Sequence, residues 1–123
     1  MPARERPIVR SADRVEAARV AAATATETRV LLGPADGMPH FAMRRFTMQA
    51  GGGMPLHTNA VEHEQYVLRG RARVTIGGES FEVAEGTVVY IPAGVPHSYQ
   101  VLEAPFEFLC LVPNLPDEIK VVG

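Results

Sequence analysis

The stretch GGGMPLHTNAVEHEQYVLRG, residues 51–70, and the shorter stretch GTVVYIPAGVPH, residues 86–97, decide how this sequence folds. They hold His57, His63 and His97, each at the edge of a short apolar run rich in strand-forming residues. Residues two apart in a strand share a face, so Asn59 is expected to point the same way as His57. Neutral imidazole is the commonest protein ligand for a transition metal. The pattern therefore predicts that the three histidines meet at one metal ion inside a small β-barrel.

The spacing of the histidines also permits a plainer interpretation. A histidine can lie on the surface or form hydrogen bonds in a core, and spacing alone leaves both interpretations open. The fourth histidine, His40, follows Gly37-Met-Pro in a turn-like segment and is interpreted as a structural or surface residue. An open site with three imidazoles would leave coordination positions for water or substrate. Such nitrogen donors suit Fe, Mn, Co, Ni, Cu or Zn rather than Mg or Ca.

Length and composition favour one domain built from short strands. The chain has 123 residues, with eleven glycines and ten prolines, which suits tight turns more than long helices. The net charge of −2 gives no footprint for nucleic acid or an anionic membrane. No apolar run approaches the roughly 20 residues that span a bilayer, and the N-terminus lacks the apolar core of a secretory signal. With a single cysteine, these features predict a soluble, cytoplasmic domain without nucleic-acid or membrane partners.

Nine short strands are predicted, separated by Gly, Pro and Asp turns. The alternation places Ala42, Arg44, Phe46 and Met48 on one face of their strand. Gly77-Gly78 predicts a tight hairpin. Regular structure is expected to end near Pro113. The strands are expected at 28–32, 41–48, 56–58, 63–69, 71–76, 79–83, 87–91, 97–101 and 106–112.

The segment before residue 28 admits two interpretations. It is rich in alanine, and Asp13 stands three residues before Glu16 in a capping-box pattern, so local propensity predicts a helix over 13–23. The β character of the remaining sequence favours an arm strand instead. We therefore expect an arm over about 1–27 and a barrel over about 28–113, with the conformation of residues 13–25 open.

The first histidine stretch resembles the first sequence motif of the cupin family. That motif reads Gly, five residues, His-x-His, three or four residues, Glu, six residues, Gly. It is matched by Gly51, His57, Asn59, His63 and Gly70.

The second stretch resembles the second cupin motif, which reads Gly, five residues, Pro-x-Gly, two residues, His, three residues, Asn. It is matched by Gly86, Pro92, Gly94 and His97, with Val101 at the Asn position. The two motifs and the strands between them cover about half of the chain. The resemblance implies an all-β fold, the double-stranded β-helix of a small single-domain cupin, which is a jelly-roll-like barrel.

Two positions depart from the usual cupin pattern. Asn59 replaces the second histidine, and His63 replaces the glutamate. The second change resembles the four-histidine single-domain cupins, whose later Phe-Leu-Cys-Leu-Val/Ile-Pro segment recurs at 108–113. The resemblance thus implies one divalent transition metal (Fe, Mn, Ni, Cu or Zn, with Fe or Mn preferred). Its ligands would be His57, His63 and His97, with Asn59 as a weaker ligand, a ligand through water or a cavity-lining residue.

The resemblance and the strand faces also suggest residues around the metal. Arg44 sits where similar cupins direct an arginine into the barrel, where it could pair with a substrate anion, or it is a solvated charge. Tyr99 is the only proton donor that the faces bring near His97. Cys110 has no evident cationic partner and is expected to be a small buried hydrophobe. The other expected pocket residues, for which core packing is the plainer interpretation, are Gln65, Phe46, Val67, Val101, Phe106 and Phe108.

Three functions fit these features. Three neutral ligands leave the charge of the metal uncompensated, which favours an oxygenase or dioxygenase acting on a small anionic or chelating substrate. The second function is a non-redox isomerase, lyase or cyclase that uses the metal as a Lewis acid. The third is a non-catalytic module that binds a small ligand. The resemblance further implies a homodimer, formed when an N-terminal strand joins the sheet of a partner.

Overall fold

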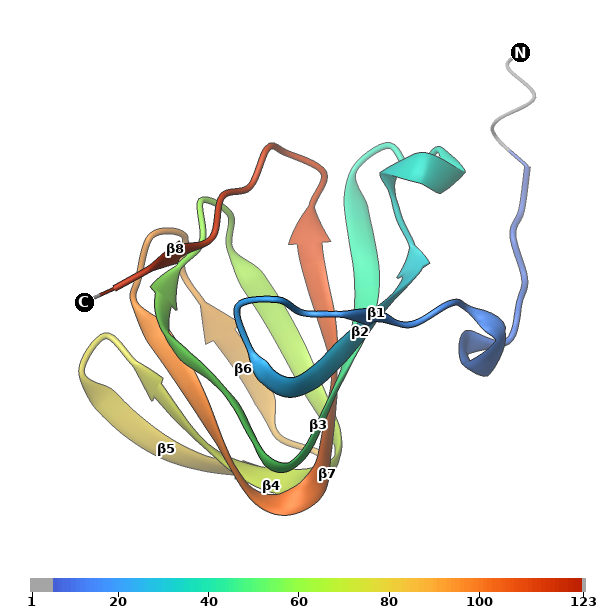
Figure 1. Ribbon diagram of the computed structural model, residues 1–123. Coiled ribbons are helices and arrows are strands. Elements are labelled where there is room, and N and C mark those ends of the chain that lie inside the picture. The colour runs from blue at the N-terminus through green and yellow to red at the C-terminus, as the bar shows by residue number, and fades with distance from the viewer. Residues whose placement is uncertain (1–5, 123) are drawn as a thin grey trace.

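The structure is a computed structural model that describes residues 6–122 (Figure 1). It contains eight strands and two short 3-10 turns in these residues. The 3-10 turns are η1 (Ala12–Arg14) and η2 (Pro34–Asp36). The strands are β1 (Ala18–Arg19), β2 (Thr24–Leu32), β3 (Phe41–Thr58), β4 (His63–Ile76), β5 (Glu79–Ala84), β6 (Val88–Ile91), β7 (His97–Pro113) and β8 (Lys120–Val121). The predicted all-β class is confirmed.

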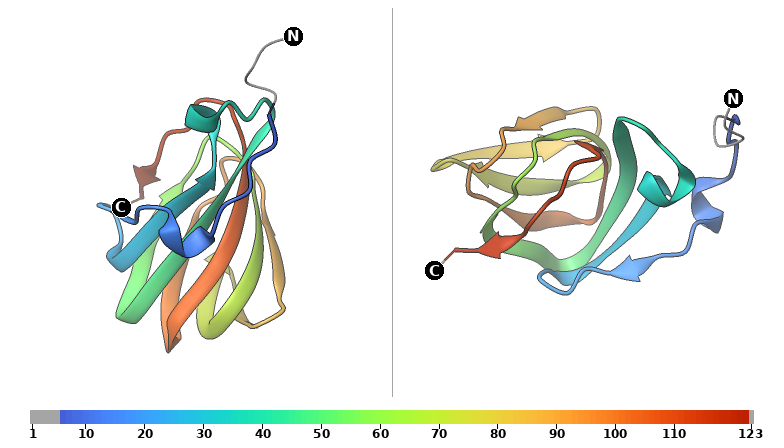
Figure 2. Two further views of the ribbon diagram at one scale, coloured as in Figure 1. Left: turned by 90° about the vertical axis from the view of Figure 1, so that its right-hand side faces the viewer. Right: turned by 90° about the horizontal axis from the view of Figure 1, so that it is seen from above.

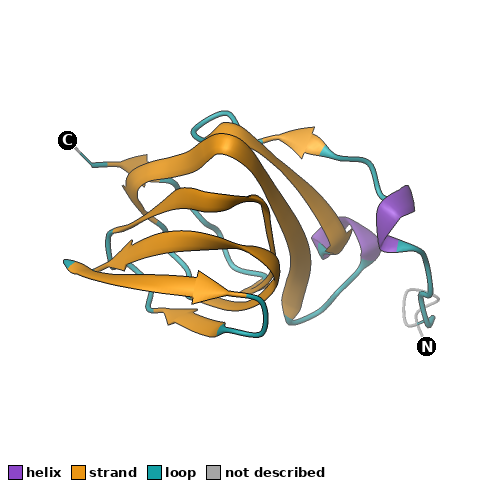
Figure 3. Ribbon diagram, turned by 90° about the horizontal axis from the view of Figure 1, so that it is seen from below, coloured by secondary structure: helices purple, strands orange, loops and turns teal. Residues whose placement is uncertain are grey.

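The strands form one antiparallel sheet that curls round an interior. Its order is β1-β2-β3-β7-β4-β5, with β6 paired to β4 and β8 paired to β3. Because β3, β4 and β7 are long and strongly bent, each of them borders more than one part of the barrel, as the views from above and below show (Figures 2 and 3). The interior is filled by one apolar cluster that includes Met48, Val67 and Phe106.

Three predicted breaks between strands are absent, because the chain bends there and stays in the sheet. The predicted strands 41–48 and 56–58 are one strand, β3, which runs through the triple glycine with a register shift. Strands 63–69 and 71–76 are likewise one strand, β4, and strands 97–101 and 106–112 are one strand, β7. Glycine marks a bulge and a strand end equally well, so the sequence pattern does not distinguish the two.

Gly70 produces the bend in β4 and reverses which residues face the interior. Before it the buried positions include His63 and Val67, and after it they are Ala72 and Val74, so the inward parity changes from odd to even. Gly70 has a φ of +80°, which favours glycine. A Cβ atom there would lie 2.2 Å from the carbonyl oxygen of Pro105 on β7. The position therefore requires glycine both for its backbone angle and for the approach of β7.

Replacing Gly70 by alanine is expected to lower the free energy of unfolding by more than about 3 kcal/mol, because backbone strain and a backbone clash add. Urea denaturation followed by circular dichroism measures the change. The matched control is Gly51→Ala, since Gly51 has a similar φ of +77° but open space around the added Cβ. The control should cost about 1 kcal/mol. Equal losses for both variants would show that the contact with β7 contributes nothing.

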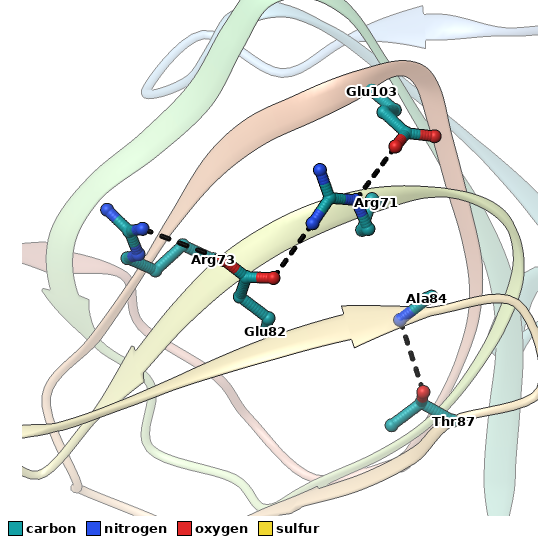
Figure 4. A network of polar contacts seen from close by, with 6 residues as sticks. All are labelled: Arg71, Arg73, Glu82, Ala84, Thr87 and Glu103. Atoms are coloured by element: carbon teal, nitrogen blue, oxygen red, sulfur yellow. Dashed lines mark hydrogen bonds and ion pairs between the residues drawn. The ribbon is translucent and has the colours of Figure 1, made fainter.

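The outer face of β4 after the bend carries charged residues. Arg71 pairs with Glu82 at 2.8 Å and with Glu103 at 2.9 Å, and Arg73 lies 3.8 Å from Glu82 (Figure 4). These pairs are exposed, so they contribute little to stability. They nevertheless show that Arg71 points outward, as the parity change at Gly70 requires.

The N-terminal arm contains a strand where a helix was one expectation. Within residues 13–23 the structure has the last two residues of η1 and the short strand β1, which pairs with β2 through Ala18 and Thr28. Asp13 does not cap a helix, because its carboxylate accepts a hydrogen bond of 2.8 Å from Arg45. Pairing with the sheet edge thus overrides the helix propensity of the alanines.

The C-terminal segment also differs from the expectation that regular structure ends near Pro113. Strand β8 follows and pairs with the end of β3, placing Val121 opposite His57 (Figure 1). No helix among residues 6–122 is long and apolar enough to cross a bilayer.

Candidate metal centre

The barrel contains a small cavity, of about 40 Å³, whose wall includes residues at the end of β3 and at the starts of β4 and β7. Aromatic, apolar and polar side chains share its wall, and none of its lining residues in the described chain is a carboxylate. The lining residues are Val20, Arg44, Phe46, Met48, Met54, His57, Asn59, His63, Gln65, His97, Tyr99, Phe108 and Ile119. All three predicted histidines and Asn59 are therefore on one cavity.

The three histidines come from three strand ends and are buried. His57 lies at the end of β3 and pairs in register with His97 at the start of β7, and His63 begins β4. The exposed fraction is 2% for His57, 1% for His97 and 7% for His63. The ring centres of His57 and His97 are 4.1 Å apart, and those of His63 and His97 are 5.9 Å apart. The fold thus brings together imidazoles that are up to 40 positions apart in sequence.

Hydrogen bonds fix the orientation of these rings. The Nδ1 atom of His57 is 2.8 Å from the carbonyl oxygen of Pro55, and the Nδ1 atom of His97 is 2.9 Å from that of Val95. A carbonyl can only accept, so each Nδ1 carries the proton and each Nε2 keeps a lone pair. The Nδ1 atom of His63 is 3.6 Å from Cys110 Sγ. Metal-binding histidines commonly have their other nitrogen anchored in this way.

Two of the three remaining ring nitrogens have no hydrogen-bond partner among the described residues. The Nε2 atoms of His63 and His97 are buried and form no hydrogen bond in the described chain. A buried polar atom without a partner costs about 1–3 kcal/mol. A metal ion at the cavity would satisfy both atoms at once, so the residues present fit a metal.

The ring separations are close to those of a shared ion but do not equal them. A ring centre lies about 3.2 Å from an ion bound at its Nε2, so two rings on one ion are roughly 4.5–5.5 Å apart. One observed pair is slightly closer than this, and the other is slightly wider. Within residues 6–122, no three His, Cys, Asp or Glu side chains are already gathered tightly enough to hold an ion. Binding would thus need small rotations of the rings.

Burial keeps two of the histidines neutral. It lowers the pKa of His63 to about 4, with a further contribution from the nearby Arg44 guanidinium. Burial likewise lowers the pKa of His97 to about 4, and the neighbouring His57 acts in the same direction. Neutral imidazole is the form that binds metal, so both rings are available as ligands from about pH 5 upward.

The same shifts predict a pH-dependent stability of the metal-free protein. The folded pKa of about 4 lies below the ordinary value of 6.5, so the unfolded chain binds more protons between these values. Stability is therefore complete above about pH 6.5 and falls as the pH drops toward 4. Between pH 7.5 and 5, each histidine should remove about 2 kcal/mol from the free energy of unfolding.

Urea denaturation of the metal-free protein at both pH values measures this loss. The double variant His63→Gln, His97→Gln lacks both titrating rings and should lose clearly less stability over the same interval. An equal loss in the variant would mean that other groups cause the pH dependence.

Asn59 lies beside the histidines and is hydrogen-bonded to Asp117, a residue that the sequence analysis did not single out. Asn59 is 5% exposed, and its Nδ2 donates to Asp117 Oδ2 at 3.0 Å. The segment that carries Asp117 also places Ile119 on the cavity wall. No motif or alternation marks this C-terminal segment, which the pairing of β8 with β3 and the hydrogen bonds of Asp117 bring to the site.

Arg44 points into the barrel and contacts Cys110, which corrects one expectation. Its Nη2 atom lies 3.7 Å from Cys110 Sγ, so this cysteine does have a cationic neighbour. Burial nevertheless raises the pKa of the Cys110 thiol, with Arg44 opposing that shift. The side chain therefore stays a buried thiol. Arg44 also lies over the ring of Phe46, 5.2 Å from its centre, and its Nε has no partner in the described chain.

An aromatic wall and one amide complete the cavity. The rings of Phe46 and Phe108 stack at 5.1 Å, and those of Phe108 and Tyr99 stack at 5.4 Å. Gln65 donates to the Tyr99 hydroxyl at 2.6 Å. Burial raises the pKa of Tyr99 far above its ordinary value, so the phenol keeps its proton and can donate it in a hydrogen bond.

Four expected pocket residues lie elsewhere, and one histidine is outside the site as expected. Val67, Phe106 and Cys110 are buried in the core beyond the cavity wall, and Val101 is half-buried against that core. Cys110 lies directly behind the wall, since its Sγ is 3.7 Å from Arg44 Nη2, 3.8 Å from Gln65 Nε2 and 3.6 Å from His63 Nδ1. His40 is exposed and takes no part in the site.

Comparison with known proteins places the site within a matched domain. The protein-family model described as "Cupin domain" matches residues 44–112 of this chain. This range is more than half of the chain and contains all three histidines. A polyketide cyclase, RemF from Streptomyces resistomycificus, superposes with a TM-score of 0.85 at 28% identity, over 96% of this chain and 87% of that protein.

Two enzymes from Bacillus subtilis match by sequence over shorter segments. Oxalate decarboxylase OxdC is 42% identical over 67 residues, and quercetin 2,3-dioxygenase is 40% identical over 52 residues. These segments cover 50% and 42% of this chain. They span only 17% and 15% of the two enzymes, so the matches concern one part of much longer proteins.

Proposed function

This chain belongs to the cupin family, and on that premise we propose that it is a metal-dependent enzyme acting on a small anionic organic substrate. The observation that carries the proposal is the set of buried imidazoles on one cavity, two of whose Nε2 atoms have no partner in the described chain. Such a set is costly for a protein that binds nothing there, and it is the donor set that a transition metal prefers.

The proposed ligands are His57, His63 and His97, each through Nε2. Nitrogen donors of this kind suit Fe, Mn, Ni, Cu or Zn, and we propose Fe(II) or Mn(II). The bound metal would act as a Lewis acid with open positions for the substrate and dioxygen. The protein would contribute imidazole rings held close to the ligand geometry by hydrogen bonds, a cavity wall that is mainly apolar and aromatic, and a neutral ligand set.

The proposed substrate is a flat molecule with an anionic chelating group, such as an enolate or a 2-oxo acid. Arg44 carries a positive charge to the cavity wall without an ion-pair partner in the described chain. A half-buried guanidinium in this position is well suited to bind an anion. The stacked rings of Phe46, Phe108 and Tyr99 offer a planar apolar surface for the body of the substrate.

The proposed reaction is an oxygenation. The described lining residues include no carboxylate that could act as a general base, and an oxygenation of an already anionic substrate needs none. Tyr99 stays protonated and is held by Gln65, so its hydroxyl can donate a hydrogen bond to a substrate oxygen.

A non-redox ring closure is the second candidate, favoured by the likeness to the polyketide cyclase RemF over nearly the whole chain. In that case the metal would polarise a substrate carbonyl, and the aromatic wall would hold the chain of carbons in a folded conformation. Arg44 would then stabilise the negative charge that develops on an enolate.

Metal analysis of untagged protein, followed by an oxygen-electrode screen, tests the proposal. We expect about one Fe or Mn per chain and oxygen uptake that depends on an added enolate, flavonol or 2-oxo acid. Tight Zn or Ni with anaerobic conversion of a poly-β-ketone would favour the cyclase. Protein that binds none of these metals would contradict both functions. We also propose a homodimer, to be tested by light scattering on the same sample.

A further inference from the structure

The orientation of the Asn59 amide is set by its contact with Asp117. The two atoms in contact are Asn59 Nδ2 and Asp117 Oδ2, 3.0 Å apart. An ionised carboxylate can only accept hydrogen bonds, so the NH₂ group of the amide must face it. The carbonyl oxygen Oδ1 of Asn59 is thereby directed to the other side.

That oxygen is buried and has no hydrogen-bond partner in the described chain. Asn59 is 5% exposed and lines the cavity that also contains His63 and His97. Three buried lone-pair donors without partners therefore belong to residues on one cavity wall: Asn59 Oδ1, His63 Nε2 and His97 Nε2. One cation bound in the cavity would give all three atoms a partner. Without it, the missing partner of each atom would need its own explanation.

Asp117 is itself held firmly by the backbone. Its Oδ1 accepts hydrogen bonds from the amide of Ala60 at 2.7 Å and from that of Glu118 at 2.8 Å. Just beyond it, β8 pairs with the end of β3 at His57. The carboxylate therefore ties the C-terminal segment to the loop after β3, next to the proposed ligands, and its position is not that of a freely rotating surface side chain.

We propose that Asp117 is a positioning residue that makes Asn59 Oδ1 the fourth protein ligand of the metal. The negatively charged carboxylate accepts a hydrogen bond from the amide NH₂ of Asn59 and polarises the amide. This polarisation increases the electron density on Oδ1. The ligand set is then three imidazole nitrogens and one amide oxygen, all neutral. Oxygen donors favour Mn and Fe relative to a purely nitrogen set. This inference rests on the proposed metal centre.

Cobalt(II) binding to the full chain tests the role of Asp117, by titration calorimetry and by the visible d–d absorption of the bound ion. Asn59→Ala and Asp117→Ala should each weaken Co(II) binding by about 10- to 100-fold. Both should shift the absorption bands in the same direction, because both remove the oxygen ligand. The double variant should bind no more weakly than Asn59→Ala, since Asp117 acts only through Asn59. His63→Ala should weaken binding at least as much.

Two further variants guard against a folding defect. Asp117→Asn keeps the size but has a single acceptor oxygen, which cannot serve both the backbone amides and Asn59 Nδ2, so it should weaken Co(II) binding and shift the bands as Asp117→Ala does. Glu118→Ala alters the neighbouring exposed residue, which contacts Lys120 rather than Asn59, and should bind Co(II) as wild type does. Additive losses in the double variant, or unchanged bands in Asn59→Ala, would overturn the role of Asp117 and leave the metal centre intact. Wild-type protein that binds no Co(II) would overturn the metal centre as well.

Discussion

Replacing His97 by alanine is expected to weaken Mn(II) or Fe(II) binding by more than about 100-fold. His97 is 1% exposed, its ring contacts His57 and lies within 5.9 Å of His63, and its Nε2 is unpartnered. It is therefore the central member of the set. Loss of a ligand should exceed the 10- to 100-fold effects known for residues that only orient ligands. Competition with a fluorescent chelator measures the affinity.

The matched control is His40→Ala, which removes one exposed histidine remote from the cavity. It should leave the affinity for the metal unchanged, because His40 does not line the cavity. Circular dichroism of both variants checks that the barrel is retained. If the folded His97 variant kept wild-type affinity, the metal would have to bind elsewhere in the chain.

The strand faces were predictable because burial alternates along each strand. The alternation in 41–48 placed Arg44 and Phe46 on the same face, which is the inner one in the structure, and Gly77-Gly78 does form the hairpin between β4 and β5. The continuity of the long strands was not predictable. At Gly70 the sheet continues because β7 packs against the bare backbone, and that is a contact between residues distant in sequence.

The candidate site shows the same division between local and long-range information. The histidines are marked by their spacing to glycines and prolines, which fix the turns that precede them. Ile119 on the cavity wall and Asp117 beside Asn59 carry no such marker, because the pairing of β8 with β3 and the hydrogen bonds of Asp117 bring their segment there. Val20 reaches it from the arm in a similar way, through its hydrogen bond with Thr26. The residues that the sequence could not assign are therefore those next to the short edge strands β1 and β8.

Arg44→Met is expected to weaken the binding of an anionic chelator to the metal-loaded protein by at least about 30-fold. Removing one partner of a desolvated charge pair costs about 2 kcal/mol or more. Acetylacetonate, a flat enolate, is a suitable probe, and calorimetry measures its affinity. Binding of neutral imidazole to the same protein should change less than about threefold, because Arg44 acts on the charge of the ligand.

Arg45→Met is the matched control for this experiment. Arg45 is the next residue on the same strand, but its side chain bonds to Asp13 of the N-terminal arm, away from the cavity. Its loss should leave both probes unaffected. Arg44→Lys keeps the charge without the planar fork, so it should recover part of the acetylacetonate affinity. If Arg45→Met weakened acetylacetonate as much as Arg44→Met, the effect would come from the overall charge of the protein. Arg44 would then have no direct role in holding the substrate.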